Sequence, residues 1–189
     1  MRVLVVGAGA VGGYFGGRLL EKGVDVTFLV RERRKRELEE RGLVIRSVHG
    51  DAVLAPKLIA AGERTEPFDL VVFSNKAYHL AGAIADAKPY VGETTMILPL
   101  LNGMAHMDVV RESFGDDKVL GGLCFIETTL NEKGEIVQTA VVLRAAIENN
   151  SLKIFVNHFF ASLEKESCIL PSCSVQWIVK TCAQRGRKP

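Results

Sequence analysis

Near its start the chain has Val3-Leu4-Val5-Val6 followed by Gly7-Ala8-Gly9-Ala10-Val11-Gly12, and these ten residues are the strongest indication of its fold. Its first part is a continuous apolar run rich in β-branched side chains, which is typical of a central parallel strand buried on both faces. Its second part has the spacing GxGxxG, and residues 10–22 then have the pattern of a helix that ends at Gly23. A strand, a glycine-rich turn and a helix in this order predict a dinucleotide-binding unit.

Each glycine of the turn has a distinct expected role. Gly7 permits the tight turn, Gly9 lets the backbone approach a pyrophosphate, and Gly12 lets the helix pack closely on the sheet. The N-terminus of the helix offers free N–H groups and the positive end of its dipole to the phosphates. The alternative is a glycine turn without a ligand. The residues expected to bind the cofactor are Gly7, Ala8, Gly9, Ala10, Val11 and Gly12.

Strand and helix patterns alternate outward from this unit as far as about residue 120. Such alternation predicts an α/β fold with a Rossmann-like, doubly wound parallel sheet. Three further glycines inside the first helix, Gly13, Gly16 and Gly17, predict a close approach of that helix to a strand or another neighbour. Strands are expected at 24–30, 43–46, 52–54, 70–73, 94–101 and 119–129, helices at 31–41, 78–88 and 104–114, and a hairpin returning through 135–139.

The composition excludes several classes of protein. The 189 residues are 48% hydrophobic and 24% charged, with a formal charge of +2. A nucleic-acid or anionic-membrane binder usually carries a larger excess of one charge, so we expect neither kind of partner. The glycine, proline and cysteine contents exclude collagenous, disordered and disulfide-scaffold classes.

The cysteines and the N-terminus point to a reducing compartment. The four cysteines form no CxxC pair, and no metal-ligand spacing links them to the histidines. We therefore expect reduced thiols and no metal site. The apolar run at the N-terminus is too short for a signal peptide or a membrane span, and no later stretch reaches membrane length. The sequence predicts a cytoplasmic protein.

The end of the second strand favours NADP(H) over NAD(H). An NAD-selective site places Asp or Glu here to bind the ribose 2′-hydroxyl, whereas this chain has Arg31, with basic residues at 33–36 close behind. A guanidinium can hold a 2′-phosphate with paired charge-assisted bonds, and a carboxylate would repel that phosphate. A solvated basic helix face is the alternative, and it is expected to account for most of residues 34–36.

Two other strand ends carry polar residues. Ligands of such sheets bind at the carboxyl ends of the strands. Lys76 follows one strand, where its ammonium group could reach a cofactor or an anionic substrate. Asn102 follows the next strand and offers both a donor and an acceptor beside the nicotinamide position. For each residue, an ordinary turn position is the alternative.

In these motifs the chain resembles the ketopantoate reductase (2-dehydropantoate 2-reductase) family. The resemblance extends in order over about the first 140 residues. It rests on Gly7-Ala8-Gly9-Ala10-Val11-Gly12, Arg31, Lys76-Ala77-Tyr78, Lys88-Pro89-Tyr90-Val91-Gly92, Leu98-Pro99-Leu100-Leu101-Asn102-Gly103, Val119-Leu120-Gly121-Gly122 and Gly134-Glu135-Ile136-Val137-Gln138-Thr139.

The resemblance implies an NADPH-dependent oxidoreductase that reduces the 2-keto group of ketopantoate to give pantoate, in pantothenate biosynthesis. It implies that residues 7–12 hold the pyrophosphate and that Arg31 holds the 2′-phosphate. Lys76 would contact the cofactor and the substrate. Asn102 would touch the nicotinamide and the substrate, as a binding and a catalytic residue. His79 stands where the family often has another polar cofactor contact.

The C-terminal part departs from the family pattern. The family's proton-donor lysine lies in a Trp-x-Lys element that opens a large helical second domain. The corresponding element here, Trp177-Ile178-Val179-Lys180, has one residue more, and Lys180 is the candidate for that catalytic role. We expect an NADP-binding domain over residues 1–150 and a remnant of the substrate and dimerisation domain over 151–189, with most of that helical domain absent. A truncated or frame-altered gene product would have this pattern.

Two other functions stay open. One is an NADP-binding module without turnover, and the other is a reductase of another 2-keto acid that shares the same cofactor side. The partner expected for either reductase is a small 2-keto acid. A homodimer is one alternative for the oligomeric state, since an uncovered apolar surface favours association.

Overall fold

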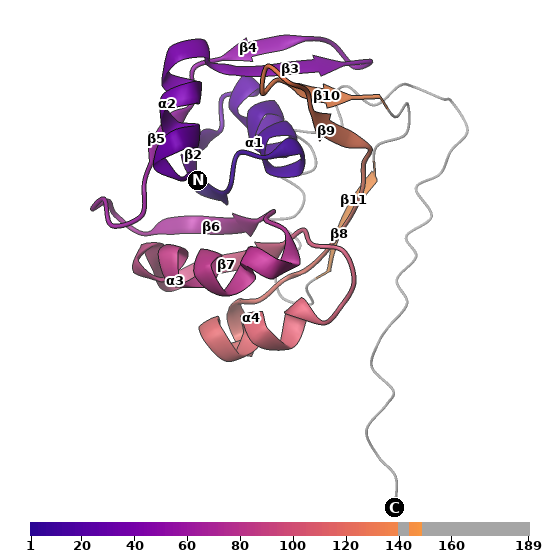
Figure 1. Cartoon of the computed structure of the whole chain (residues 1–189). Helices are drawn as coiled ribbons and strands as arrows, with labels where there is room; N and C mark the ends of the chain where they lie inside the picture. Colours follow the sequence, from indigo (N-terminus) through magenta and orange to yellow (C-terminus); the bar gives the residue numbers. More distant parts are fainter. Residues whose placement is uncertain (140–143, 149–189) are drawn as a thin grey trace, which may run out of the picture.

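The fold is built around a five-stranded parallel sheet. In the computed structural model, which describes residues 1–139 and 144–148, the strands lie in the order β5-β2-β1-β6-β7 (Figure 1). β1 is the central strand, with β2 and β5 on one side and β6 and β7 on the other, and all neighbouring strands pair in parallel. The predicted doubly wound sheet is thus confirmed. Its strands are β1 (Arg2–Val6), β2 (Asp25–Leu29), β5 (Lys57–Ile59), β6 (Phe68–Phe73) and β7 (Val91–Pro99).

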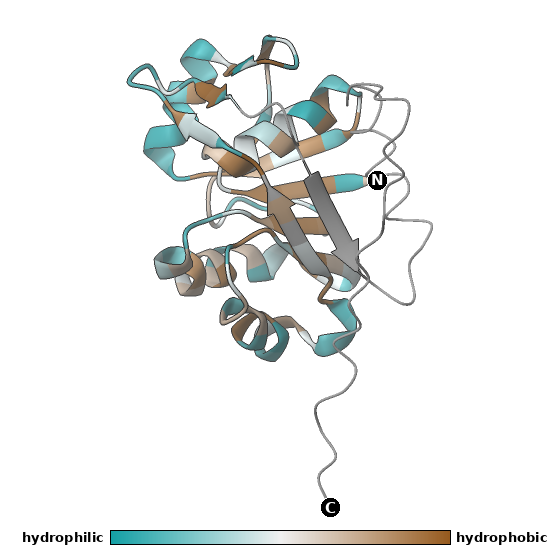
Figure 2. Ribbon diagram, turned by 90° about the vertical axis from the view of Figure 1, so that its right-hand side faces the viewer, coloured by the Kyte–Doolittle hydropathy of each residue, from teal (hydrophilic) through white to brown (hydrophobic). Residues whose placement is uncertain are grey.

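Helices cover both faces of this sheet, as the apolar residues 3–6 of β1 require. Val3 and Val5 belong to the buried cluster on the α1 side, whereas Leu4 and Val6 belong to the cluster under α3 and α4. Figure 2 shows the central strands as mainly hydrophobic along their length. None of the helices in the described part of the chain has the length and apolar character needed to cross a membrane. The helices are α1 (Ala10–Glu21), α2 (Glu32–Arg41), α3 (Leu80–Ala87) and α4 (His106–Phe114), with 3₁₀ segments η1 (Ala77–His79), η2 (Lys88–Tyr90) and η3 (Asp116–Lys118).

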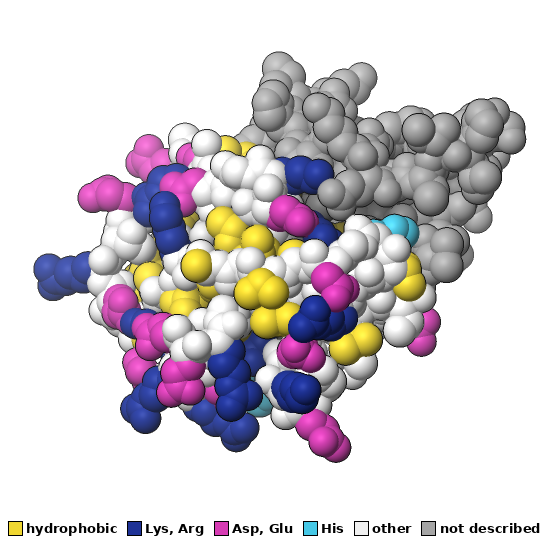
Figure 3. Space-filling view, turned by 90° about the horizontal axis from the view of Figure 1, so that it is seen from above, with side chains coloured by type: hydrophobic (Ala, Val, Ile, Leu, Met, Phe, Trp, Pro, Cys, Tyr) yellow, Lys and Arg dark blue, Asp and Glu magenta, His cyan; other side chains and the backbone are white. Residues whose placement is uncertain are grey.

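A second sheet of four strands, in the order β4-β3-β10-β9, lies on the far side of α1 (Figure 1). The antiparallel pairing of β9 with β10 confirms the predicted hairpin. The parallel pairing of β10 with β3 was not predicted. Val53 of β4 is 68% exposed, and Figure 3 shows hydrophobic side chains at the centre of the face seen from above, with charged side chains around them. The strands are β3 (Leu43–Ser47), β4 (Ala52–Leu54), β9 (Thr128–Leu130) and β10 (Ile136–Gln138).

The single strand predicted at 119–129 is wrong. The chain forms a single parallel bridge with β7, between Val119 and Ile97. It then enters β8 (Gly121–Phe125), which pairs antiparallel with β11 (Arg144–Glu148), and β9 begins after a break. The stretch is continuous in sequence, but its two parts pair with different partners.

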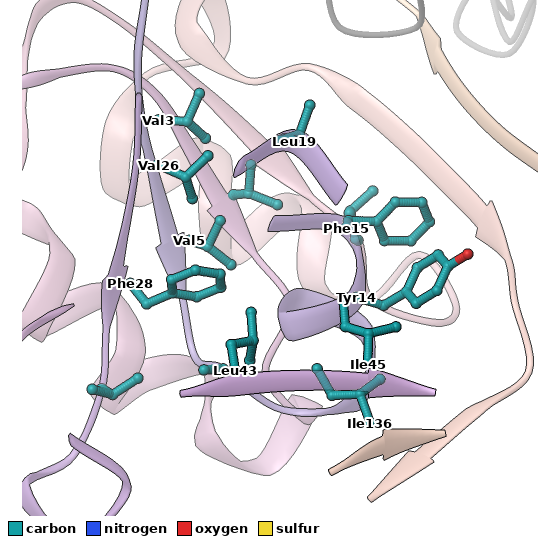
Figure 4. Packing of buried hydrophobic residues seen from close by; sticks show 14 of the residues in the cluster. Val3, Val5, Tyr14, Phe15, Leu19, Val26, Phe28, Leu43, Ile45 and Ile136 are labelled. Atoms are coloured by element: carbon teal, nitrogen blue, oxygen red, sulfur yellow. The ribbon is translucent and has the colours of Figure 1, made fainter. Parts of the chain in front are cut away.

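The glycines of α1 let this helix fit between the two sheets, which confirms the predicted close approach. A Cβ at Gly16 would lie 2.6 Å from Cζ of Phe28 in the central sheet. A Cβ at Gly17 would lie 2.6 Å from Cδ1 of Ile45 in the second sheet, and one at Gly13 would overlap Ile136. Figure 4 shows these side chains packed around α1. Larger side chains at these positions would force the layers apart.

Candidate functional site

The register of the central sheet brings four strand ends into one row. Leu29, Val6, Phe73 and Pro99 pair in turn across β2, β1, β6 and β7. The loops that follow these residues therefore meet at the same edge. This carboxyl edge is where open α/β sheets bind their ligands.

The glycine-rich loop at this edge contains three glycines with three different physical reasons. Gly7 has a φ of +92°, which disfavours a side chain. A Cβ at Gly12 would lie 2.5 Å from the carbonyl oxygen of Gly7 and would also overlap Ser74. Gly9 has an extended backbone, and a Cβ there would meet nothing within 4 Å. Packing among residues 1–139 and 144–148 therefore does not require glycine at position 9, and their side chains leave space in front of it for a ligand.

The carbonyl groups of this loop are bound to the protein. Ser74 Oγ donates to the carbonyl oxygens of Val6 and Gly7 at 3.3 and 3.5 Å. The carbonyl of Gly9 accepts from the N–H of Gly13 at 2.8 Å, and that of Ala8 accepts from Arg34. The first turn of α1 has N–H groups without intrahelical partners and contains no acidic residue. Donors rather than acceptors are thus left for a ligand, which fits a diphosphate.

Arg31 and His79 come together from two different loops. Arg31 is the N-cap of α2, and His79 ends the 3₁₀ segment η1 after β6. Their side chains are exposed, and the Arg31 Nη2 atom lies 3.3 Å from Nδ1 of His79. The ring of Tyr78, which is 79% exposed, lies 4.5 Å from the His79 ring between centroids. This corner has the charge and the flat surfaces that a phosphorylated adenosine requires.

The solvated helix face, which was the alternative for most of residues 34–36, is found only in part. Arg33 does fit that description, since its side chain is 93% exposed and pairs with Glu37. The Arg34 side chain, in contrast, is 19% exposed and binds the backbone at Ala8. Lys35 forms an ion pair with Glu63, in the loop after β5. Sequence spacing could not separate Arg34 from Arg33, because both have Glu37 within one helical turn.

Lys76 and Asn102 lie where their positions after β6 and β7 predict. Both residues are exposed at the carboxyl edge. The carbonyl of Lys76 accepts from the N–H of His79 at 2.8 Å and from the side chain of Asn75 at 3.0 Å. Within the described residues, the Asn75 Oδ1 atom is buried without a hydrogen-bond partner. No hydrogen bond joins the side chains of Lys76 and Asn102 to other described residues, and Lys180 lies outside those residues. The catalytic and substrate-binding roles therefore stay predictions.

Titratable groups with shifted pKa values lie mostly away from this edge. Burial lowers the pKa of His106 and raises that of the Cys124 thiol. Hydrogen bonds from Arg33 and Arg34 lower the pKa of Glu37, so this carboxylate is charged at neutral pH. Among the described residues, no three His, Cys, Asp or Glu side chains are grouped as metal ligands. The described part of the edge offers cations, amides and backbone donors for binding.

The comparisons with known proteins point to one family. A family model described as "Ketopantoate reductase PanE/ApbA" matches residues 3–149. A protein of Bacillus subtilis (strain 168), named "Uncharacterized oxidoreductase YkpB", is 52% identical over 140 residues, which are 74% of this chain and 46% of that protein. A 2-dehydropantoate 2-reductase of Streptococcus pyogenes serotype M1 is 32% identical over 124 residues, 65% of this chain and 40% of that protein.

A solved structure agrees with the sequence comparisons. The crystal structure of 2-dehydropantoate 2-reductase from Geobacter metallireducens GS-15 superposes with a TM-score of 0.72 at 31% identity, and the match covers 79% of this chain and 49% of that one. The chain thus spans less than half the length of the curated relatives it matches. Both the fold and the sequence motifs of the carboxyl edge belong to that shared part.

Proposed function

This chain belongs to the ketopantoate reductase family, and from that premise we propose that its carboxyl edge binds NADPH for the reduction of ketopantoate to pantoate, a step of pantothenate biosynthesis. The observation that carries the proposal is Gly9. No atom of the residues that the structure describes lies within 4 Å of its Cβ position, while the neighbouring loop carbonyls are bound to the protein. A diphosphate fits this arrangement of free space and free N–H groups.

The preference for NADPH rests on the corner formed by Arg31 and His79. The guanidinium lies at the end of β2, where an NAD-selective site has a carboxylate. A 2′-phosphate placed there would receive charge-assisted hydrogen bonds from Arg31. The imidazole at 3.3 Å adds a second polar contact that the same phosphate can reach. Both side chains are exposed, so binding requires no burial of an unpaired charge.

The reaction itself is assigned to the remaining part of the edge. The bound cofactor supplies the hydride for the 2-keto carbon. Asn102, after β7, orients the nicotinamide and the keto group, and Lys76, after β6, attracts the carboxylate of the keto acid. In this proposal Lys180 gives a proton to the alkoxide oxygen that forms, so that an alcohol is released. A reductase of another 2-keto acid would use the same groups.

Two measurements test the proposal. Calorimetry should detect NADPH binding to the chain, and Gly9→Val should abolish it because the isopropyl group occupies the diphosphate position, while the melting temperature changes little. Equal NADPH affinity in the two proteins would contradict the site. Absorbance of NADPH in the presence of ketopantoate then tests turnover, with Lys180→Ala and Asn102→Ala as slower variants. Binding without turnover would assign the chain as an NADP-binding module.

A further inference from the structure

Arg34 joins three separate parts of the chain through one guanidinium group. Its Nε atom donates to the carbonyl of Ala8 at 3.2 Å, and Nη2 donates to the carbonyl of Gly134 at 3.1 Å. Its Nη1 atom lies 3.2 Å from Oε2 of Glu37, in the same helix. The glycine-rich loop is thereby tied to the turn between β9 and β10. Only the planar fork of arginine has donors in the directions of both carbonyls.

The turn that holds Arg34 is itself fixed. The Oδ1 atom of Asn131 accepts from the N–H groups of Lys133 and Glu135 at 3.0 and 2.9 Å. Gly134 has a φ of +75°, and a Cβ there would lie 2.8 Å from the Arg34 Nη1 atom. A side chain at position 134 would therefore push the guanidinium away. The carbonyl oxygen of Gly134 is therefore held by the turn in a position where it accepts a hydrogen bond from Arg34.

The bond to Ala8 has a consequence for the neighbouring peptide group. Ala8 lies between Gly7 and Gly9, where the backbone has few steric limits. In a trans peptide the C=O and the following N–H point in opposite directions, and the described residues contain no cis peptide bond. Because Arg34 holds the Ala8 carbonyl, the N–H of Gly9 must point the other way. Without that bond the peptide could rotate and turn its oxygen toward a bound anion.

We propose that Arg34 is a positioning residue, which fixes the glycine-rich loop in the conformation that binds the cofactor diphosphate without touching the cofactor itself. This inference rests on the proposed function, since it assumes that the loop holds a diphosphate. Arg34 differs in this respect from Arg31, which faces the 2′-phosphate. Loss of Arg34 should weaken every ligand that contains the diphosphate, whereas loss of Arg31 should weaken only the ligand with a 2′-phosphate.

The test measures the affinities of NADPH, NADH and ADP for four proteins by calorimetry. Arg34→Ala should weaken all three ligands by a similar factor of roughly tenfold, since a charged hydrogen bond to the loop is lost. Arg31→Ala should weaken NADPH alone. Arg33→Ala is the matched control, because Arg33 is one residue away and pairs with the same Glu37 but does not reach the loop. It should bind all three ligands as the wild type does.

A second readout needs no ligand. The amide resonance of Gly9 in the ¹⁵N NMR spectrum of the free protein should shift in Arg34→Ala and stay in place in Arg33→Ala. Arg34→Lys keeps the charge but reaches one carbonyl only, so it should show an intermediate loss of affinity. If Arg34→Ala fails to fold, Glu37→Gln removes the ion pair that orients the guanidinium and should give a smaller loss with the same ratio among ligands.

The outcomes are distinct. Unchanged affinities and an unchanged Gly9 resonance in Arg34→Ala would overturn the inference, and so would a loss confined to NADPH, which would make Arg34 a direct phosphate ligand. A wild-type protein that binds none of the three ligands would instead contradict the proposed function.

Discussion

Arg31 places an exposed positive charge at the carboxyl edge of the central sheet. It follows the last residues of β2, is exposed, and has the imidazole of His79 beside it. Its side chain makes no ion pair among the described residues, so its charge is available to a ligand. The sequence identified this residue because the position after the second strand has a known chemical role. No comparable positional rule marks Ser74 or Arg34, which act through the loop's carbonyl groups.

We predict that Arg31→Ala lowers the affinity for NADPH and leaves that for NADH nearly unchanged. Removal of a charge-assisted phosphate contact costs about 1.5–3 kcal/mol, or roughly ten- to a hundredfold in affinity. Titration calorimetry with both cofactors measures the difference. Arg36→Ala is the control, because Arg36 is exposed on the same helix. Similar affinities of the wild type for NADH and NADPH would rule out the 2′-phosphate role.

His106 provides a prediction about pH. This side chain is 6% exposed at the start of α4, its Nε2 atom has no partner in the described residues, and burial lowers its pKa. The folded protein therefore protonates this side chain at a lower pH than the unfolded chain does, for which the pKa is about 6.5. Because the unfolded state binds more protons as the pH falls from about 6.5 toward the lower folded-state pKa, stability drops in that range by up to about 1.4 kcal/mol per pH unit.

His106→Leu should remove this part of the pH dependence. The free energy of unfolding, measured with urea at several pH values, should then fall less steeply in the variant than in the wild type on the acid side. Near pH 7 the variant should be as stable as the wild type or more stable, because an unpaired buried polar atom is replaced by an apolar group. Parallel curves for the two proteins would show that His106 takes no part in the acid response.

Among the helices, strands and turns, those with a signal in a short stretch of sequence were predicted correctly. The apolar run of β1, the glycine spacing of the loop and the Asn131 to Gly134 turn all lie where the sequence placed them. The second sheet could not be predicted in the same way, because β3 and β10 pair across a long stretch of sequence. The edge strand β5 has three residues, too few for a periodic signal. Arg34 was missed because its partner turn belongs to that second sheet.

Helix α1 shows how packing reverses an intrinsic preference. Alanine is favoured over glycine inside a helix by about 0.5–1 kcal/mol. Gly16→Ala should nevertheless destabilise the protein by about 1–3 kcal/mol, because the new Cβ would lie 2.6 Å from Phe28 and 3.0 Å from Val5. Gly82→Ala in α3 is the matched control, since no atom lies within 4 Å of its Cβ position. That change should stabilise by about 0.4–1 kcal/mol.

Urea unfolding of the two alanine variants measures both effects. A stabilised Gly16→Ala protein would show that α1 can move away from the central sheet at little cost. The opposite signs expected at these two helical glycines would assign the difference to the packing of α1 against Phe28 and Val5 of the central sheet.

For the whole molecule, the site is a product of segments that are distant in sequence. Arg34 contacts both Ala8 and Gly134 because the second sheet packs beside the glycine-rich loop, and Arg31 contacts His79 because β2 and β6 end at the same edge of the central sheet. The part of the chain that carries these contacts is also the part that the family model matches, residues 3–149. Under the proposed function, cofactor binding would depend on the same contacts as folding, so the two would be coupled.

That coupling gives a prediction for the molecule as a unit: NADPH should raise its melting temperature. A ligand that binds only the folded state at a hundred times its dissociation constant stabilises by about 2.7 kcal/mol. For a chain of this size that corresponds to roughly 5–10 °C. At the same concentration NADH should give a smaller shift, because it lacks the phosphate that faces Arg31. Gly9→Val should abolish both shifts while its own melting temperature without ligand stays near that of the wild type, since a Cβ at position 9 would meet no atom of the described residues within 4 Å. An undiminished shift in Gly9→Val would mean that the dinucleotide stabilises the molecule from another surface, and the glycine-rich loop would lose its role.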